Sequence, residues 1–364
     1  MPDAIWIDRN EELPALAATL GAQSSIGLDT EFLRERTFFP QLCLLQIAAG
    51  DRIWCIDTLR GGDLRPLAPV LVAAATQKIV HAARQDLEVI HLHSRCLVTP
   101  VFDTQIAAGC VGMRPQIGYA DLAQMLLGVT VAKGQTRTDW SRRPLSAAQL
   151  HYAAEDVKHL GEIAARLTQR LADLGRESWV LEDCRALSHP SLYDANPARA
   201  WERVRGLAQL QPHPRQRARA LAVWREREAR TRDLPRAWIL SDTAILDAAQ
   251  TNPPDLPGLR RLRSLPEDLP DVLALRVLET LQAASRQEPE DMQPGAVLRP
   301  TEEQKSLLEK LAARVARLAA ELGVSPEILA PRGELKALAL GERNTACLRG
   351  WRREVVGADL LANL

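Results

Sequence analysis

The chain has 364 residues, a length that corresponds to two or three domains rather than one. It contains 46 Lys plus Arg and 46 Asp plus Glu, and this balance excludes both a histone-like polycation and an acidic disordered tail. Hydrophobic residues make up 46% of the chain, as in ordinary globular proteins, yet no apolar stretch approaches the ~20 residues that a membrane helix requires.

The first 160 residues alternate short apolar runs with helical patterns. We expect strands at Ala4–Ile7, Ser25–Glu31, Cys43–Ala48, Arg52–Asp57 and Ile79–Ala82, and helices at 10–20, 64–75, 85–93, 103–111 and 119–127. Adjoining strands come first and strands separated by helices follow, so the pattern predicts a mixed α/β sheet. A long helix is expected over about 147–174, because Ser146 and Gln149 form a capping-box pattern at its start.

Strand patterns nearly vanish in the second half of the chain. The segment 188–197 is rich in Ser, Pro and Asn and indicates a linker. Residues 200–285 then favour about five short helices, 287–300 indicates a second linker, and 301–364 is again helical. The sequence therefore predicts two small all-helical modules, whose similar size is a weak sign of duplication.

Two carboxylates stand at the end of one apolar strand. Side chains alternate along a strand, so Ile26 and Leu28 face one side while Asp29 and Glu31 face the other. Two carboxylates this close repel unless a cation lies between them, and hard oxygen ligands suit Mg²⁺ or Mn²⁺. Taken alone, however, this spacing favours a solvated face at a strand end.

Further acidic candidates lie along the chain. Asp86 follows the strand at 79–82 and, taken alone, is typical of a helix N-cap. Tyr152 and Asp156 are spaced i, i+4 on the long helix, so their side chains share a face. Taken alone, this spacing favours a packed tyrosine and a solvated aspartate.

Two basic regions are candidates for nucleic-acid contacts. Lys133, Arg137 and Trp140 combine cations with an aromatic ring and could hold a nucleic-acid strand, although a solvated loop explains them equally well. The stretch 201–236 carries 10 cations against 4 anions. It fits either a phosphate-contacting surface or a helix face with internal Arg–Glu pairs.

Together, these signals match one family. Asp-x-Glu on an early strand, an Asp after a middle strand and Tyr-x-x-x-Asp on a late helix resemble the three motifs of the DEDD exonucleases, and the tyrosine resembles their DEDDy branch. The surrounding blocks are similar to the ribonuclease D family: LDTEFLRERTFFPQLCLLQIA (28–48), HAARQDLEVI (81–90), FDTQIAA (102–108), RTDWSRRPLS (137–146) and HYAAEDVKHL (151–160).

The resemblance covers the whole chain and implies its architecture. It implies an α/β mixed-sheet, ribonuclease-H-like DEDDy exonuclease domain at 1–190. Two small all-α HRDC-type domains would follow, the first at 200–288 and a more divergent one at 298–364. HRDC modules are helical domains that also occur in helicases.

The same resemblance implies a 3′→5′ exoribonuclease that uses two divalent ions, Mg²⁺ or Mn²⁺, and releases 5′-mononucleotides. Asp29 would bridge both ions, Glu31 and Asp156 would complete the ion beside the attacking water, and Asp86 would support the second. Tyr152 would orient that water. The implied substrates are RNA 3′ ends, chiefly of tRNA precursors and small structured RNAs.

Two other functions stay open at this point. A DNA-directed 3′→5′ exonuclease would use the same four carboxylates, whereas a catalytically dead RNA-binding scaffold would be expected to have lost one. The six cysteines form no C-x-x-C pair, which argues against a zinc knuckle and a disulfide framework. With no apparent signal peptide either, we expect a cytoplasmic protein that does not associate with membranes.

Overall fold

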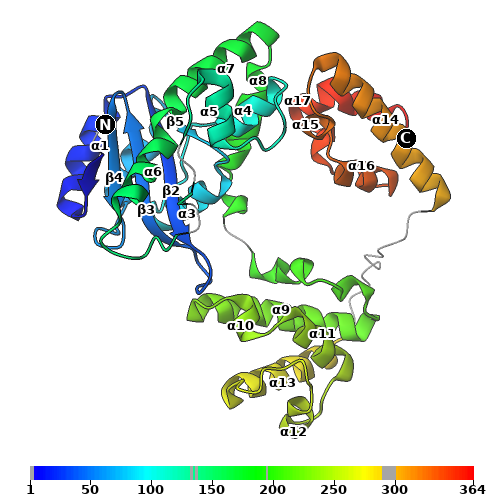
Figure 1. Ribbon diagram of the computed structural model, residues 1–364. Coiled ribbons are helices and arrows are strands. Elements are labelled where there is room, and N and C mark those ends of the chain that lie inside the picture. The colour runs from blue at the N-terminus through cyan, green and yellow to red at the C-terminus, as the bar shows by residue number, and fades with distance from the viewer. Residues whose placement is uncertain (1–3, 132–133, 136–137, 194–195, 289–300) are drawn as a thin grey trace. The chain divides into compact units, whose positions relative to one another are not determined.

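The computed structural model describes residues 4–131, 134–135, 138–193, 196–288 and 301–364. The chain divides into two compact units, drawn in Figure 1. The first unit consists of residues 1–33, 41–193 and 300–364, and the second of 34–40 and 194–299. Within the described residues, no helix combines the length and hydrophobicity that a bilayer crossing needs.

The first unit is built around a six-stranded sheet with the order β1-β4-β3-β2-β5-β6. Its strands are β1 (Ile5–Ile7), β2 (Ser25–Leu33), β3 (Gln41–Ala49), β4 (Arg52–Asp57), β5 (Gln77–Val80) and β6 (Val101–Asp103). Strand β3 is antiparallel to β2 and β4, and the other neighbours pair in parallel. The predicted mixed sheet is confirmed. Strand β6 was not expected, because three buried residues are too few to show an alternating pattern.

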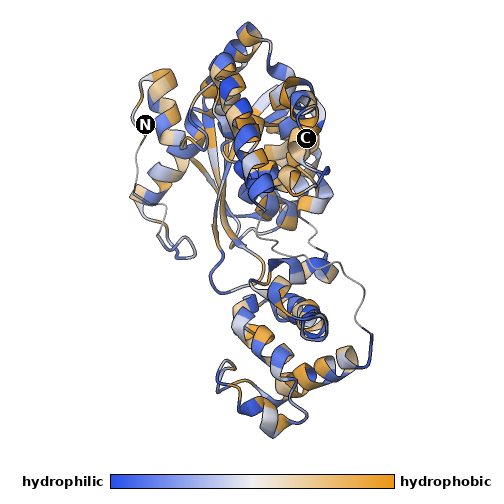
Figure 2. Cartoon of the chain, turned by 90° about the vertical axis from the view of Figure 1, so that its right-hand side faces the viewer, coloured by the Kyte–Doolittle hydropathy of each residue, from blue (hydrophilic) through white to orange (hydrophobic). Residues whose placement is uncertain are grey.

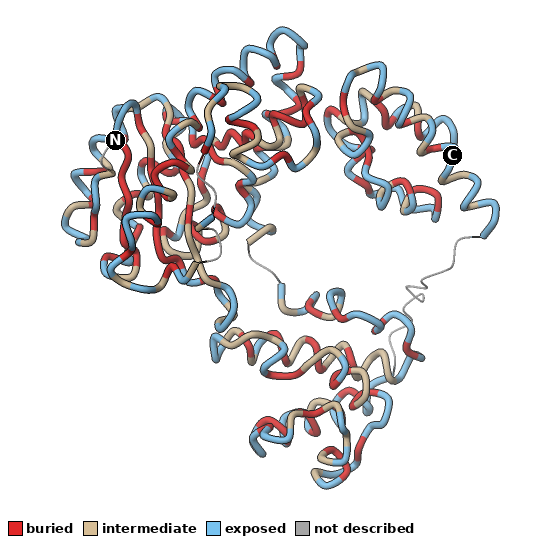
Figure 3. Tube along the Cα trace, in the orientation of Figure 1, coloured by how far each residue is buried: buried red, intermediate tan, exposed pale blue. Residues whose placement is uncertain are grey.

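The two faces of the sheet have different covers. Ile26 and Leu28 of β2 lie in a core shared with the helices on one face: α1 (Leu13–Gly21), α2 (Ala68–Leu71) and α3 (Arg84–Ser94). The opposite face is covered by α4 (Thr104–Cys110), α5 (Tyr119–Leu127), α6 (Ala147–Lys158), α7 (Leu160–Leu174) and α8 (Glu177–Leu187). Buried residues accordingly run along the central strands (Figure 3).

The long helix expected over 147–174 is interrupted. Its capping box at Ser146 and Gln149 is confirmed, but α6 ends at Lys158, and His159 separates it from α7. The hydroxyl of Tyr119 donates to the carbonyl of Glu155 at 2.9 Å and accepts from the backbone N–H of His159 at 3.2 Å. This hydroxyl stands where the direct i to i+4 bond of a continuous helix would run, and an inserted side chain is a known cause of helix breaks.

Residues 301–364 belong to the same unit as the sheet. They form α14 (Glu302–Leu322), α15 (Pro326–Leu329), α16 (Arg332–Ala339), α17 (Gly350–Arg352) and α18 (Ala358–Leu361). Buried residues of α14 to α18 join those of α4 to α8 in one hydrophobic core. Arg176 reinforces the junction, because its guanidinium donates to the carbonyls of Cys110 and Leu322 at 2.8 and 2.6 Å.

Residues 196–288 of the second unit are mainly helical. Its α-helices are α9 (Pro212–Arg232), α10 (Arg236–Ile239), α11 (Asp242–Thr251), α12 (Leu256–Arg260) and α13 (Asp271–Ser285), preceded by a 3₁₀ helix at Pro197–Arg203. The 21-residue α9 is longer than the short helices expected here, because its many arginines leave only a narrow apolar stripe that includes Leu221 and Ala222. Polar and apolar residues alternate along the helices of both units (Figure 2).

The helices of 212–251 and 302–339 follow the same plan. Helices α9 and α14 both have 21 residues, α10 and α15 both have four, and each of α14, α15 and α16 begins 90 residues after its counterpart α9, α10 or α11. The residues that cap the C-terminal ends of the two long helices, Asp233 and Gly323, both have a left-handed backbone. Ile239 and Leu329, which close the four-residue helices, are both buried.

Candidate active site

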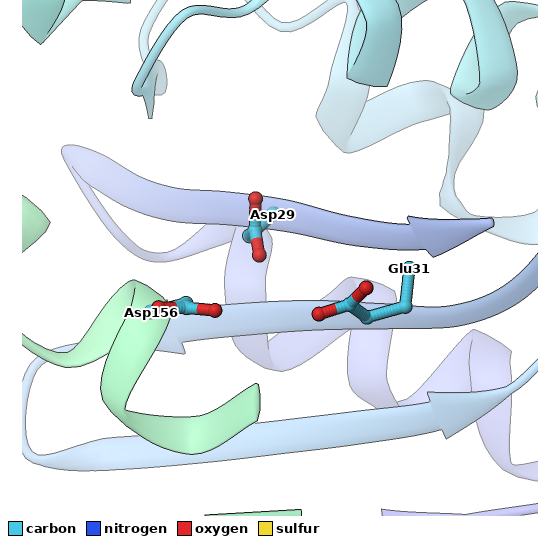
Figure 4. Close-up of side chains that lie close together, drawn as sticks. All are labelled: Asp29, Glu31 and Asp156. Carbon is cyan, nitrogen blue, oxygen red and sulfur yellow. The ribbon is translucent and has the colours of Figure 1, made fainter. Parts of the chain in front are cut away.

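Three carboxylates converge above β2. Asp29 and Glu31 project from the same face of this strand, as its alternation predicts, and Asp156 reaches them from α6 (Figure 4). One oxygen from each of the three lies within 4.8 Å of the others. They line a hollow of about 320 Å³ together with residues of β2, α5 and α6 that include Phe32, Tyr119 and Tyr152. The geometry places a compact set of hard oxygen ligands beside an open space.

Asp86 lies next to this group without being part of it. It occupies the first turn of α3 and is buried, so the N-cap interpretation is wrong: the N-cap position belongs to Ala83. The hydroxyl of Thr30 donates to its carboxylate at 2.5 Å. Because Thr30 stands between Asp29 and Glu31 in the chain, this bond ties Asp86 to the strand that carries both of them.

Tyr152 lies one helical turn before Asp156 and lines the same hollow. Its hydroxyl hydrogen-bonds the Asp156 carboxylate. The i, i+4 spacing therefore brings the two polar groups together. The ring of Tyr152 is packed against the core that holds Trp140, as the alternative interpretation expected, but Asp156 is half-buried rather than solvated. His159 does not join the group, because its ring nitrogen lies 3.8 Å from the carboxylate of Glu155.

His81 and Tyr119 also line the hollow, and neither stands out in the sequence as a site residue. Both ring nitrogens of His81 have partners, the Thr104 hydroxyl at 2.8 Å and the Ile117 carbonyl at 2.9 Å. Its ring meets that of Tyr119 edge to face, with the centroids 5.9 Å apart. No spacing rule links these residues to the carboxylates, because they come together only through the packing of α4, α5 and α6.

Burial and mutual repulsion raise the pKa values of the acidic group. Burial is the largest cause in each case. It raises the pKa of Asp29 well above its usual range, with added repulsion from Asp86, Asp156 and Glu31. The pKa of Glu31 rises to about 9, with repulsion from Asp156 and then Asp86.

The other two carboxyls shift less, because hydrogen bonds oppose the burial. The pKa of Asp156 rises to about 7 against the bond from Tyr152, and that of Asp86 rises to about 6 against the bond from Thr30. The four groups cannot all be ionised near neutral pH unless positive charge enters the site.

This donor set fits divalent metal ions. Carboxylate oxygens are the ligands that Mg²⁺ and Mn²⁺ prefer, and a bound cation removes the repulsion that raises these pKa values. Among the described residues, Asp29, Glu31 and Asp156 are the group with metal-binding spacing. The acidic group therefore supports dependence on a divalent cation.

The sequence predicts nucleic-acid contacts at Lys133, Arg137 and Trp140. Lys133 and Arg137 lie outside the described residues. Trp140 is 1% exposed, so the expectation that it offers a stacking surface to nucleic acid is wrong. Its indole is packed in a core with Leu44, Cys55 and Ala153, and its centroid lies 6.1 Å from that of Tyr152. An aromatic residue beside arginines is a pattern that indicates a nucleic-acid-binding loop, but the pattern does not show whether the aromatic side chain is buried.

The sheet, its helical cover and the acidic hollow define a 3′→5′ exonuclease. A family model described as 3'-5' exonuclease matches residues 4–172, and one described as HRDC domain matches residues 215–289.

The chain belongs to the ribonuclease D family. It is 36% identical over 374 residues to a ribonuclease D of Granulibacter bethesdensis, an alignment that covers 99% of this chain and 92% of the relative. It is 37% identical to that of Gluconacetobacter diazotrophicus, with 99% and 93% covered. The crystal structure of Escherichia coli RNase D, described as an exoribonuclease involved in structured RNA processing, matches with a TM-score of 0.91 at 30% identity, covering 99% of this chain and 98% of that one.

The protein is thus a 3′→5′ exoribonuclease, and the family resemblance drawn from its motifs is confirmed. So are the mixed α/β exonuclease domain and an HRDC domain in the middle of the chain. A second HRDC domain and the boundaries of the three domains stay predictions.

Proposed function

We propose that this exoribonuclease trims the 3′ ends of tRNA precursors and other small structured RNAs with two divalent ions in one site. The observation that carries the proposal is the convergence of Asp29, Glu31 and Asp156 with the Tyr152 hydroxyl bound to Asp156. A buried acidic group of this kind is stable in its ionised form only around cations.

Each side chain has a distinct part in this proposal. Two bound divalent ions supply charge neutralisation and water activation in phosphodiester hydrolysis. Asp29 would hold both ions, Glu31 and Asp156 would complete the one beside the attacking water, and Asp86, which accepts a hydrogen bond from Thr30, would support the other. Tyr152 would hydrogen-bond the attacking water and orient it. A tyrosine with a reference pKa near ~10 is a poor general base at neutral pH, so its part is positional.

The second unit offers a surface for the RNA. A groove of about 550 Å³ runs along α9 and α13, and Trp201, Trp224, Arg219 and Arg227 contribute to its lining. Indole faces stack on nucleobases, and guanidinium groups pair with phosphates. We propose that the single-stranded part of the substrate lies in this groove.

Some arginines of the basic segment 201–236 have a structural role instead of contacting RNA. Arg236 forms a bidentate pair with the buried carboxylate of Glu226 at 2.5 and 2.8 Å, and Arg225 pairs with Asp242 at 2.7 Å. These arginines hold the helices together, as the alternative interpretation of this segment expected. Arg227 is exposed in the groove and is the cation that we assign to phosphate.

Residues 301–364 are proposed to be a second HRDC-type module. The support is the shared plan of α9–α10–α11 and α14–α15–α16, with equal lengths for the first two helices of each set and a constant offset of 90 residues. Equal spacing over three consecutive elements is the signature of a duplicated unit. The boundaries at 190, 200, 288 and 298 are part of this proposal, as is the cytoplasmic location.

One experiment tests the substrate and the metal together. Full-length protein is incubated with a tRNA carrying a 3′ extension in Mg²⁺, with and without EDTA, and the products are resolved by length and end group. We expect stepwise shortening from the 3′ end, 5′-mononucleotide products and no reaction in EDTA. Matched RNA and DNA oligonucleotides test the remaining alternative, since faster removal of deoxynucleotides would point to a DNA-directed enzyme.

A further inference from the structure

The break between α6 and α7 lies next to an acidic residue of the site. Asp156 directly follows Glu155, whose carbonyl accepts the Tyr119 hydroxyl, and precedes by three residues His159, whose N–H donates to it. The inserted hydroxyl therefore spans the helical turn that carries Asp156. A continuous helix would close this turn with a direct bond from His159 to Glu155 and would point its side chains differently.

The tyrosine that makes this insertion is held firmly. Tyr119 is the first residue of α5, and its ring meets the ring of His81 edge to face. His81 is itself anchored at both ring nitrogens, by Thr104 and by the carbonyl of Ile117. Burial raises the pKa of Tyr119 well above that of an ordinary tyrosine, so its hydroxyl keeps the proton with which it donates to Glu155.

The interrupted helix also lies close to the strand that carries Asp29. A Cβ atom at Gly27 would stand 3.3 Å from the carbonyl oxygen of Val157 and 3.2 Å from a methyl carbon of Leu160. Glycine thus permits a near approach of the break to β2, two residues before Asp29. The distance between Asp156 and Asp29 depends on both features, the inserted hydroxyl and the missing side chain.

We propose that Tyr119 is a positioning residue, whose hydroxyl, inserted between Glu155 and His159, sets the placement of Asp156 against Asp29 and Glu31. The proposal rests on the metal site described above. Tyr119 does not touch the reacting atoms in this role; it acts through the direction of the α6 backbone. A displacement of about 1 Å in a catalytic group can cost ~10²-fold in rate, so a small straightening of the helix has a measurable effect.

The test removes one oxygen atom, the Tyr119 hydroxyl, from the full-length protein. In Tyr119→Phe, we expect kcat on a single-stranded RNA oligonucleotide to fall about 10-fold, with KM within twofold of wild type. The Mn²⁺ concentration for half-maximal binding, measured by calorimetry without RNA, should rise several-fold. A purely structural tyrosine would change the melting temperature and leave the Mn²⁺ affinity and kcat of the folded protein unaltered.

Tyr193→Phe is the matched control. Tyr193 is half-buried in the same unit, and its hydroxyl also donates to a backbone carbonyl, that of Leu187, outside the acidic hollow. The control should keep wild-type kcat and Mn²⁺ affinity. Equal kcat and equal Mn²⁺ affinity for the two variants would overturn the proposal.

A second variant covers the case in which Tyr119→Phe does not fold. Gly27→Ala introduces the Cβ that crowds Val157 and Leu160, and it should lower Mn²⁺ affinity and kcat in the same direction. Wild-type values for folded Gly27→Ala would then refute the positioning role. If the wild-type protein bound Mn²⁺ but degraded no RNA, the proposed function would fail, while the Mn²⁺ comparison would still decide the role of Tyr119.

Discussion

The indole rings of Trp179 and Trp351 stack with their centroids 4.1 Å apart and their planes 7° from parallel. Trp179 lies on α8 beside the sheet, and Trp351 lies on α17 near the end of the chain. Polar contacts surround the stack: Arg352 pairs with Asp183 at 2.6 Å, and the Trp351 backbone N–H donates to Glu182 at 2.9 Å. The last 64 described residues are therefore built into the unit that carries the active site.

The first prediction concerns this junction. Trp351→Ala removes a 4%-exposed indole from the core and should lower the free energy of unfolding by about 3–5 kcal/mol, as for other large-to-small changes in cores. Urea denaturation followed by circular dichroism measures the loss. Trp238→Ala is the control, since this indole in the second unit is 57% exposed and its loss should cost little. A loss below about 1 kcal/mol for Trp351→Ala would mean that the tail is not part of the core.

Asp29→Asn should nearly abolish turnover while leaving the fold intact. Asparagine keeps the shape of the side chain but removes the charge that we propose holds two cations, and the expected loss in kcat is at least ~10³-fold. The metal-free variant should be no less stable than wild type, because repulsion raises the pKa of Asp29 in the native site. More than a tenth of the wild-type rate in saturating Mg²⁺ would contradict the assignment.

Tyr152→Phe should reduce the rate by a smaller factor. If Tyr152 orients the attacking water as proposed, the change removes one hydrogen bond to that water, an effect of about 10–10²-fold in kcat. Because the hydroxyl is not a metal ligand, Mn²⁺ affinity should stay within about twofold of wild type. The measurement is a single-turnover rate at saturating Mn²⁺. A rate as low as that of Asp29→Asn would show that Tyr152 does more than orient water.

The metal-free protein should lose stability as the pH rises. Burial and repulsion raise the pKa values of Asp86, Asp156 and Glu31 to about 6, 7 and 9, so the native state binds more protons than the unfolded chain above about pH 4. Stability falls with pH wherever the native state binds more protons. We expect the melting temperature in EDTA to decrease between about pH 5 and pH 9.

Mn²⁺ should reverse this trend, because a bound cation favours the ionised carboxylates. Its binding should also release protons near neutral pH, which calorimetry in buffers of different ionisation enthalpy detects. The matched control is Asp29→Asn, in which one source of repulsion is absent, so the decrease with pH should be shallower. A melting temperature that rises steadily from pH 5 to pH 9 in EDTA would contradict the shifted pKa values.

Arg227→Glu tests the groove on α9. If Arg227 contacts a phosphate, the variant should bind single-stranded RNA more weakly, and its slope of log affinity against log salt should flatten by about 0.7. Arg263→Glu makes the same charge change at an exposed position of the second unit that does not line the groove. Fluorescence anisotropy at four salt concentrations gives both slopes. Identical slopes for the two variants would place the RNA elsewhere.

Local periodicity was enough to predict two side-chain pairs of the site. The pairing of Asp29 with Glu31 on one face follows from the two-residue repeat of a strand, and that of Tyr152 with Asp156 follows from the 3.6-residue repeat of a helix. Both repeats are properties of the backbone over a few residues. The resemblance to a family then linked these local signals to Asp86, whose position as a lone aspartate favoured an N-cap.

The tertiary structure decided what periodicity does not encode. In the folded chain Trp140 is buried, and His81 is hydrogen-bonded at both ring nitrogens. The Tyr119 hydroxyl is inserted into the long helix, and Trp351 stacks on Trp179. Each of these contacts joins residues that are tens of positions apart in the chain. They form because distant apolar surfaces and polar groups find partners when the core closes, and no repeat within a short segment carries that information.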